Sequence, residues 1–223
     1  MKIKWKELNR GIVLAVILAG GVAVSVVVQN TQFKKNIPDI ENRVKELGEE
    51  MAECSVGSGE GVRRRQRAFV MNEYLESKQG AGDMLGMTMG KGSLMYLVNQ
   101  PAEENGEINS AEFKVNDIDV YKAGADGATV TLNYEIKLDM TGTPEVLLFG
   151  EMLRTHWYIE DAEINEGNSS NESIEDKRRE ATVSGTYTLL MEKDGGSWKI
   201  TNAEGYSDLN LGKNSNGGET GVG

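Results

Sequence analysis

Apolar and polar side chains alternate along the chain between residues 128 and 139. A period of two is typical of a β-strand with one face buried and the other in water. At about 3.4 Å per residue, this stretch predicts one strand about 37 Å long. A second alternation, over residues 181–191, predicts another long strand. The apolar members of the first stretch are Ala128, Val130, Leu132, Tyr134, Ile136 and Leu138.

Turn residues join these strands into hairpins. Ala125-Asp126-Gly127 links the first strand to an upstream strand over residues 113–120, and Asp194-Gly195-Gly196 links the second to a returning strand. The apolar side of the upstream strand changes parity across Asn116-Asp117, which predicts a β-bulge. A further strand is predicted around His156-Trp157-Tyr158.

An amphipathic helix precedes the strands, with Asn36 and Pro38 marking its start. Its apolar residues recur at spacings of three and four, which places them on one helical face. The pattern covers two heptads, so two interpretations stay open: a helix packed on its own domain, or a neck that pairs two subunits. The face consists of Ile37, Ile40, Val44, Leu47 and Met51.

A second helix is predicted over Val62–Lys78, after a Gly/Ser-rich break at Cys54–Gly61. Its first turn carries the arginines of Arg63-Arg64-Arg65-Gln66-Arg67. Cations near a helix N-terminus oppose the helix dipole, so we expect acidic partners for them within the chain rather than an anionic ligand. The buried side of this helix should contain Phe69, Val70, Tyr74 and Leu75.

The segment Gly11–Val28 is apolar except for Ser25. As a helix it would be about 27 Å long, close to the hydrocarbon thickness of a bilayer. Lysines and Arg10 lie on its N-terminal side, so the positive-inside rule places the N-terminus in the cytoplasm and the rest outside. A cleaved signal peptide and a pilin-like leader ending at Gly11 are alternatives. The anchor residues are Gly11, Ile12, Leu14, Ile17, Leu18, Val22, Val26 and Val28.

The whole chain carries a net charge of −11 and residues 1–28 carry +3, which leaves −14 for the remainder. An acidic domain repels phosphates, so nucleic acid is not an expected partner. The single cysteine, Cys54, excludes an intramolecular disulfide and favours a bacterial exterior over an animal one. The expected partners are the lipid bilayer, other envelope proteins or a second copy of the chain.

The chemistry of catalysis and metal binding is sparse in this sequence. His156 is the only histidine and lies in an apolar, aromatic stretch, which is typical of a structural histidine. A serine or cysteine nucleophile would need a base such as this one with an acid to orient it. No phosphate loop or dinucleotide fingerprint is present. We therefore expect no enzyme, no metal site and no cofactor.

Helices followed by a meander of long antiparallel strands predict an α+β fold, with the helices covering one face of a curved sheet. The predicted organisation is a basic cytoplasmic segment (1–10), a transmembrane helix (11–29), a helical neck and linker (30–61), an extracytoplasmic α+β domain (62–208) and a disordered tail (209–223).

The last hairpin, from Ala181-Thr182-Val183 to Gly196-Ser197-Trp198-Lys199-Ile200-Thr201, resembles the closing hairpin of nuclear-transport-factor-2-like (cystatin-like) domains. The resemblance covers residues 62–208 and implies a cone-like sheet. An anchor joined to such a domain is similar to the assembly-scaffold subunits of type IV (conjugative) secretion machines, which implies a non-catalytic role.

The leading functional hypothesis is therefore a membrane-anchored scaffold of a bacterial envelope or secretion assembly. The first alternative is a small-ligand-binding or sensor domain that uses the cone of the sheet, and the second is a pilin-like filament subunit. The candidate cavity residues are Tyr134, Trp157, Tyr187 and Trp198. An open cavity between them would favour the ligand hypothesis, and a closed one the scaffold.

Overall fold

A computed structural model describes residues 10–76, 88–102, 105–124, 126–159 and 177–212, with side chains from residue 30 onward. The chain divides into two compact units, Met1–Ile40 and Glu41–Gly223. Each unit is described by itself, and the candidate site lies entirely within the second.

The first unit is helical wherever it is described. Helix α1 (Arg10–Cys54) begins in it and continues through Pro38, so the prediction that the helix starts at Asn36–Pro38 was wrong. A proline inside a helix removes one backbone hydrogen bond and crowds the preceding turn, at a cost of about 3 kcal/mol, so the rest of the helix has to offset this cost. Among the residues searched, no helix is long and apolar enough to cross a membrane. The side chains of Gly11–Val28 lie outside the described residues, so the predicted anchor stays a prediction.

Three helical segments contribute to the second unit. The last part of α1 buries Val44, Leu47 and Met51 completely. Helix α2 (Gly59–Glu73) follows a turn in which Gly57 has a φ of 98° and Gly59 a φ of 63°. Helix α2 ends five residues earlier than predicted because the backbone beyond it becomes extended, and the Leu75 amide donates to the Ile200 carbonyl. Helix α3 (Lys91–Asn99) is short and buries Leu94 and Val98.

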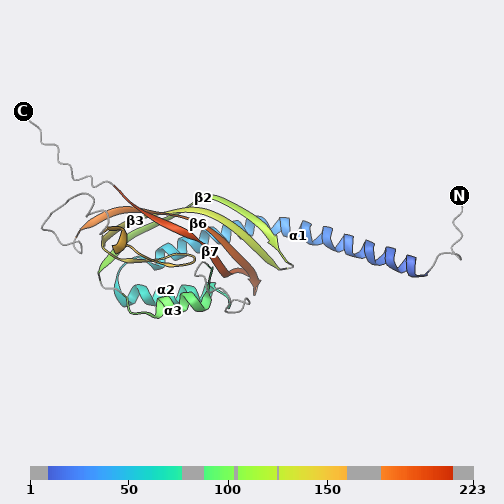
Figure 1. Cartoon of the computed structure of the whole chain (residues 1–223), viewed down its shortest axis with the longest axis horizontal. Helices are drawn as coiled ribbons and strands as arrows, with labels where there is room; N and C mark the ends of the chain where they lie inside the picture. Colours follow the sequence, from blue (N-terminus) through green and yellow to red (C-terminus); the bar gives the residue numbers. More distant parts are fainter. Residues whose placement is uncertain (1–9, 77–87, 103–104, 125, 160–176, 213–223) are drawn as a thin grey trace, which may run out of the picture. The chain divides into compact units, whose positions relative to one another are not determined.

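The main sheet has five antiparallel strands in the order β1-β7-β6-β3-β2. Figure 1 shows this sheet as a curved layer, with α2 and α3 on one side of it. The predicted α+β fold with a curved antiparallel sheet is therefore confirmed, and it agrees with a nuclear-transport-factor-2-like architecture. The strands are β1 (Thr88–Gly90), β2 (Gly106–Ala123), β3 (Gly127–Gly142), β6 (Arg178–Asp194) and β7 (Ser197–Leu211).

The predicted strand alternation is confirmed in β3 and β6. Val130, Leu132, Tyr134, Ile136, Leu138 and Met140 are all buried, and the residues that alternate with them lie on the outer face. The register of β2 against β3 shifts between Val115 and Asp117, so the predicted bulge is present. Both predicted hairpin turns also occur. Strand β7 runs to Leu211, so its last three residues fall within the segment predicted as a tail.

A short hairpin lies between the long strands and is formed by β4 (Glu145–Leu147) and β5 (Met152–Arg154). The strand predicted around His156-Trp157-Tyr158 is wrong, because residues 156–159 form a helical turn. Thr155 explains the turn. Its hydroxyl donates to the Pro144 carbonyl at 2.8 Å, and its own carbonyl accepts from the amides of residues 158 and 159. These bonds reverse the chain at the end of β5.

Two of the four arginines at the start of α2, Arg63 and Arg67, have the acidic partners that were predicted. The Arg63 side chain is 3% exposed and forms an ion pair with Glu145, which is 8% exposed. Arg67 forms an ion pair with Glu60 near the start of the same helix, and Arg65 donates to the Val56 carbonyl. The buried pair of Arg63 and Glu145 ties α2 to the β4–β5 hairpin.

Candidate functional site at the cone of the sheet

Four aromatic rings gather on the face of the sheet that the helices cover. Phe113 comes from β2, Tyr134 from β3, Tyr187 from β6 and Phe149 from the tip of the β4–β5 hairpin. Neighbouring ring centroids lie 5.4–6.3 Å apart, within the range of favourable aromatic contacts. Phe149 is fully buried and touches the other three rings. The hairpin tip therefore fills the middle of the cone.

Each of the two cone tyrosines lies over a glycine of the next strand. Tyr134 is paired with Gly185, and a Cβ added to that glycine would lie 2.6 Å from the tyrosine ring. Tyr187 is paired with Gly205, where a Cβ would lie 2.8 Å from the ring. A ring that covers a strand glycine supplies the packing that the glycine lacks. Both hydroxyls are thereby directed across the sheet toward the β7 edge.

Glu151 closes this edge of the cone. It lies in the loop between β4 and β5, where the Leu148 amide donates to its carbonyl at 2.9 Å. Its Oε1 atom accepts a hydrogen bond from the Tyr187 hydroxyl at 2.8 Å and a second from the Ser207 hydroxyl. Bonds to an ionised acceptor are stronger than those between neutral groups. Two hydroxyls from neighbouring strands thus hold one half-buried carboxylate in place.

The Tyr134 hydroxyl is buried and has no hydrogen-bond partner among the described residues. Burial is the main cause that raises its pKa, and the charge of Glu151 adds to the effect. Burial also raises the pKa of Tyr187, followed by the influence of Tyr134 and Glu151. Both hydroxyls therefore stay protonated at neutral pH. That of Tyr187 donates to Glu151, while the Tyr134 hydroxyl retains a proton to donate.

Tyr158 and Asp208 complete the polar rim. Burial, then the charges of Asp208 and Glu151, raise the pKa of Tyr158, so the three groups are electrostatic neighbours. Asp208 is exposed on β7 and Tyr158 is partly exposed on the helical turn after β5. The rim therefore combines two carboxylates with tyrosine and serine hydroxyls, beside an apolar aromatic interior.

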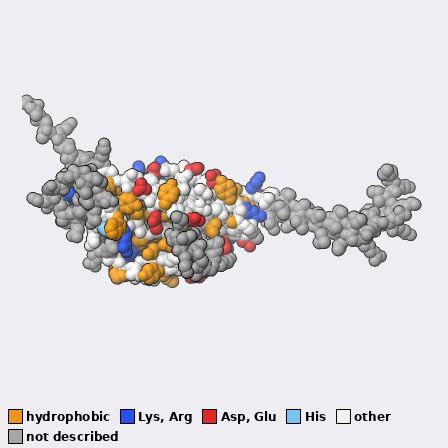
Figure 2. All heavy atoms as spheres, in the orientation of Figure 1, with side chains coloured by type: hydrophobic (Ala, Val, Ile, Leu, Met, Phe, Trp, Pro, Cys, Tyr) orange, Lys and Arg blue, Asp and Glu red, His pale blue; other side chains and the backbone are white. Residues whose placement is uncertain are grey.

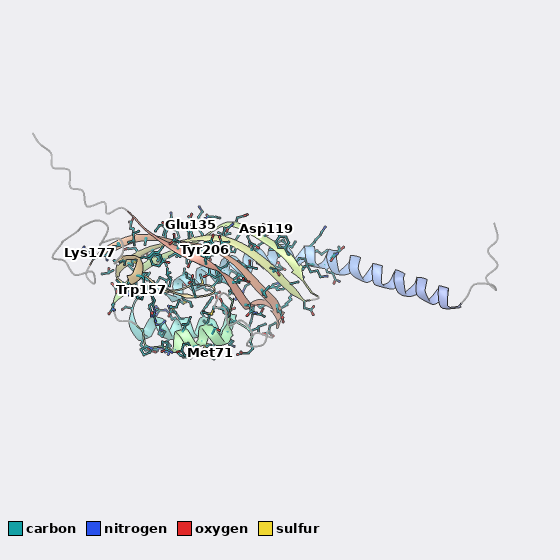
Figure 3. All side chains as sticks on the ribbon, in the orientation of Figure 1. Met71, Asp119, Glu135, Trp157, Lys177 and Tyr206 are labelled. Atoms are coloured by element: carbon teal, nitrogen blue, oxygen red, sulfur yellow. The ribbon has the colours of Figure 1, made fainter. Side chains whose placement is uncertain are left out.

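The structure brings together two of the four predicted cavity residues. Tyr134 and Tyr187 are neighbours, whereas Trp157 is 60% exposed on the helical turn (Figure 3). Trp198 is buried at the far end of the β6–β7 hairpin, where the Lys193 ammonium lies 6.0 Å from its ring centroid. Trp198 pairs with Lys193, which lies six residues from Tyr187 on β6. Trp198 is therefore about 20 Å along the strand from the cone tyrosines.

Sequence reasoning missed Glu151, Ser207 and Phe149. Phe149 ends the apolar run Val146–Phe149 and Glu151 lies in the tight loop after it, where no periodicity indicates which side chain enters the cone.

The only histidine of the sequence, His156, stacks on Trp157, with ring centroids 4.2 Å apart. Within the described ranges, no group of three or more His, Cys, Asp or Glu residues is placed to hold a metal ion.

A separate cavity of about 420 Å³ lies between the end of α1 and α2, with Cys54, Phe69 and Asn72 in its lining. The Cys54 thiol is buried and donates to the Met51 carbonyl at 3.1 Å. Burial raises the pKa of Cys54 to about 12. A thiol is nucleophilic only as the thiolate, so Cys54 should be inert in the native protein.

Native Cys54 is expected to react with a thiol reagent at pH 8 about a thousandfold more slowly than in urea, from the difference in thiolate fraction. Ellman's reagent measures both rates, and urea-unfolded protein is the control. A comparable native rate would show that the thiol is neither buried nor protonated as described.

Comparison with known proteins gives similarity to solved structures alone. No protein family matches the sequence, and no curated protein matches it. The structure of a type 2 hexachlorocyclohexane dehydrochlorinase (LinA) is 11% identical with a TM-score of 0.42, covering 87% of this chain and 99% of its own. The type 3 enzyme from Novosphingobium barchaimii LL02 is 12% identical with a TM-score of 0.37, covering 82% and 92%.

These comparisons correct two functional expectations. Both matched structures are titled as enzymes. Their titles contradict the expectation of a non-catalytic scaffold and the expectation that the chain is not an enzyme. Nothing in them supports a likeness to secretion scaffolds. The exclusion of an enzyme rested on the single histidine, although Glu, Asp and Tyr can also transfer protons. At these similarities, neither the substrate nor the catalytic residues of the two enzymes carry over to this chain.

Proposed function

We propose that the domain binds a small, partly apolar ligand at the edge of the cone beside Glu151. The observation that carries this proposal is the buried Tyr134 hydroxyl, which lacks a partner among the described residues. A buried hydroxyl without a partner costs about 1–3 kcal/mol. A ligand atom that accepts its proton would recover this free energy.

The neighbouring groups define the polar end of the ligand. Glu151 is held by Tyr187 and Ser207 through one oxygen, Oε1, and a carboxylate offers about four acceptor positions. A ligand with an amine or hydroxyl donor for Glu151 and an acceptor for Tyr134 would complement both. The aromatic interior suits an apolar body, since most small-molecule sites combine apolar walls with a few placed polar groups.

The test is a binding screen of the full-length chain against amines and alcohols that carry aliphatic or aromatic bodies, read by protein NMR. Glu151→Gln keeps the size of the side chain and removes its charge, so we expect each cone ligand to bind at least about tenfold more weakly. The matched control is Glu135→Gln, which changes a glutamate on the opposite face of the sheet (Figure 3) and should leave affinity unchanged.

The Tyr134→Phe variant distinguishes a ligand-binding role of Tyr134 from a purely structural one. The free variant should be more stable than the parent by about 1 kcal/mol, because the unpaired hydroxyl is gone, yet it should bind the ligand more weakly. The proposal would be contradicted if the ligands had the same affinity for the Glu151→Gln variant as for the parent protein. So would a Tyr134→Phe variant that is less stable and binds unchanged.

We also propose that Gly11–Val28 anchors the chain in a bilayer with the α+β domain outside. The apolar run, whose one polar residue is Ser25, and the basic residues before it support this placement. A protease added to intact cells should then cleave the domain. Protection of the domain until the cells are lysed would contradict the orientation.

A further inference from the structure

We propose that the outer face of the main sheet binds a neutral oligosaccharide, at a site separate from the cone. A hollow of about 420 Å³ lies on this face, where the ends of β2, β3 and β6 run side by side. Its polar lining comprises Ser110, Glu112, Lys137, Asp139, Glu180 and Thr182.

The register places these side chains on the outer face. Lys137 pairs with Thr182, and Asp139 pairs with Glu180 and with Ser110. Each is offset by one residue from an inner-face position, because successive side chains of a strand point to opposite sides. Hydroxyl, ammonium and carboxylate groups therefore converge in one place, offering both donors and acceptors.

The charge of the hollow is partly neutralised within the protein. Asp139 forms an ion pair with Arg178, whose Nε donates to Oδ1 at 2.8 Å, and it also accepts from the Asn109 amide at 3.3 Å. The hydrogen bond from Arg178 is the main cause that lowers the pKa of Asp139. On the side of the molecule seen in Figure 2, acidic and basic side chains are likewise interspersed with uncharged and hydrophobic ones. This environment suits an uncharged ligand with many hydroxyl groups better than an ion.

An exposed aromatic ring lies farther along the same face. Tyr206 is 69% exposed and pairs with Thr186, which in turn pairs with Asn133. The Thr186 hydroxyl donates to the Asn133 side-chain oxygen at 2.8 Å. A tyrosine combines a flat apolar ring with a polar tip, and can pack on the apolar face of a sugar while neighbouring groups bind its hydroxyls. The ring and the amide–hydroxyl pair together form a second contact point.

The spacing of the two contact points favours a chain of sugars over a single one. Thr182 in the hollow and Thr186 beside Tyr206 are four residues apart on β6, or about 14 Å along the strand. The intervening row contains Ser184, which pairs with Glu135. A polyanion would be repelled by the −14 charge of residues 29–223, and Lys137 and Arg178 beside the carboxylates of the hollow disfavour a polycation, so a neutral glycan is the occupant that the surface fits.

The test uses chitohexaose and cellohexaose as neutral probes, with the full-length chain and titration calorimetry. We expect Tyr206→Ala to weaken binding of the preferred probe at least about tenfold, and Tyr206→Phe, which keeps the ring, to retain it. Tyr121→Ala is the matched control, since Tyr121 is also exposed on the outer face but lies on β2, beside Thr129. Its affinity should equal that of the parent.

A second pair of variants tests the hollow. Thr182→Val should weaken binding several-fold, whereas Thr188→Val, on the same face beyond Tyr206, should not. Failure of both probes to bind, or equal binding by Tyr206→Ala and the parent, would overturn the proposal. Tighter binding of a heparin oligosaccharide or of a lysine-rich peptide than of either neutral probe would also overturn it. These results are independent of the cone, because none of the variants alters a cone residue.

Discussion

Glu145→Ala is expected to lower the free energy of unfolding by about 3–5 kcal/mol, the cost of leaving a buried charge without its partner. Arg63 is 3% exposed and donates to Glu145 and, at 3.0 Å, to the Gln66 side chain. Its Nε already lacks a hydrogen-bond partner among the described residues. Without Glu145, the buried guanidinium would keep the Gln66 side-chain oxygen as its main acceptor.

Urea unfolding of the full-length chain, followed by tryptophan fluorescence, measures the change. Replacing both residues, Arg63→Met with Glu145→Met, should recover most of the loss because neither charge then remains buried. Arg178→Ala is the surface control. Its ion pair with Asp139 is exposed on the arginine side, so the change should be within about 1 kcal/mol. Equal losses from Glu145→Ala and Arg178→Ala would refute the assignment of a buried pair.

The β half of the fold could be predicted because its signal is local. Alternation fixes which side chains of β3 face inward, and Gly195 and Gly196 adopt positive φ values of 57° and 94°, as their hairpin turn requires. The bulge before Asp117 is also visible in the sequence, because the apolar positions of the strand change there from odd to even residue numbers. None of these features depends on knowing which distant segment packs on the sheet.

The candidate site could be predicted only in part because its groups converge from distant segments. Tyr134 and Tyr187 were accessible to sequence reasoning, since they occupy inner positions of regular strands. Glu151 comes from a loop whose position depends on Phe149 entering the cone. Trp157 was misplaced because its local aromatic composition resembles a strand, while the hydrogen bonds of Thr155 produce a helical turn.

The interior of the cone is closed, an arrangement expected to favour a scaffold over a ligand held between the aromatic residues, so a ligand has to bind outside this interior. Phe149 occupies the centre, and the Tyr74 hydroxyl donates to its carbonyl, which fixes the hairpin tip to the end of α2. Displacing a fully buried phenylalanine would cost several kcal/mol. A ligand is therefore expected to place its body at the rim, where Glu151, Ser207 and Tyr158 are partly exposed, and to extend only its acceptor atom to the buried Tyr134 hydroxyl, leaving Phe149 in place.

Gly185→Ala is expected to lower the free energy of unfolding by about 2–3 kcal/mol, through overpacking of the cone. The new methyl group would lie 2.6–2.7 Å from three atoms of the Tyr134 ring and hydroxyl. That ring cannot move away freely, because it also contacts Phe113, Phe149 and Tyr187. Thermal and urea unfolding of the full-length chain would measure the loss.

A second substitution tests whether the clash with Tyr134 is the cause. In a Tyr134→Leu background, the ring and hydroxyl are absent, so adding Gly185→Ala should cost less than half as much as in the parent. Gly92→Ala is the control for glycine replacement as such. Gly92 lies in the first turn of α3, where an added Cβ would meet no atom within 4 Å, and alanine should stabilise that helix by up to about 1 kcal/mol. If Gly185→Ala costs the same with and without the tyrosine ring, the loss arises from the backbone of β6, and the role of Tyr134 as the cover of Gly185 would have to be abandoned.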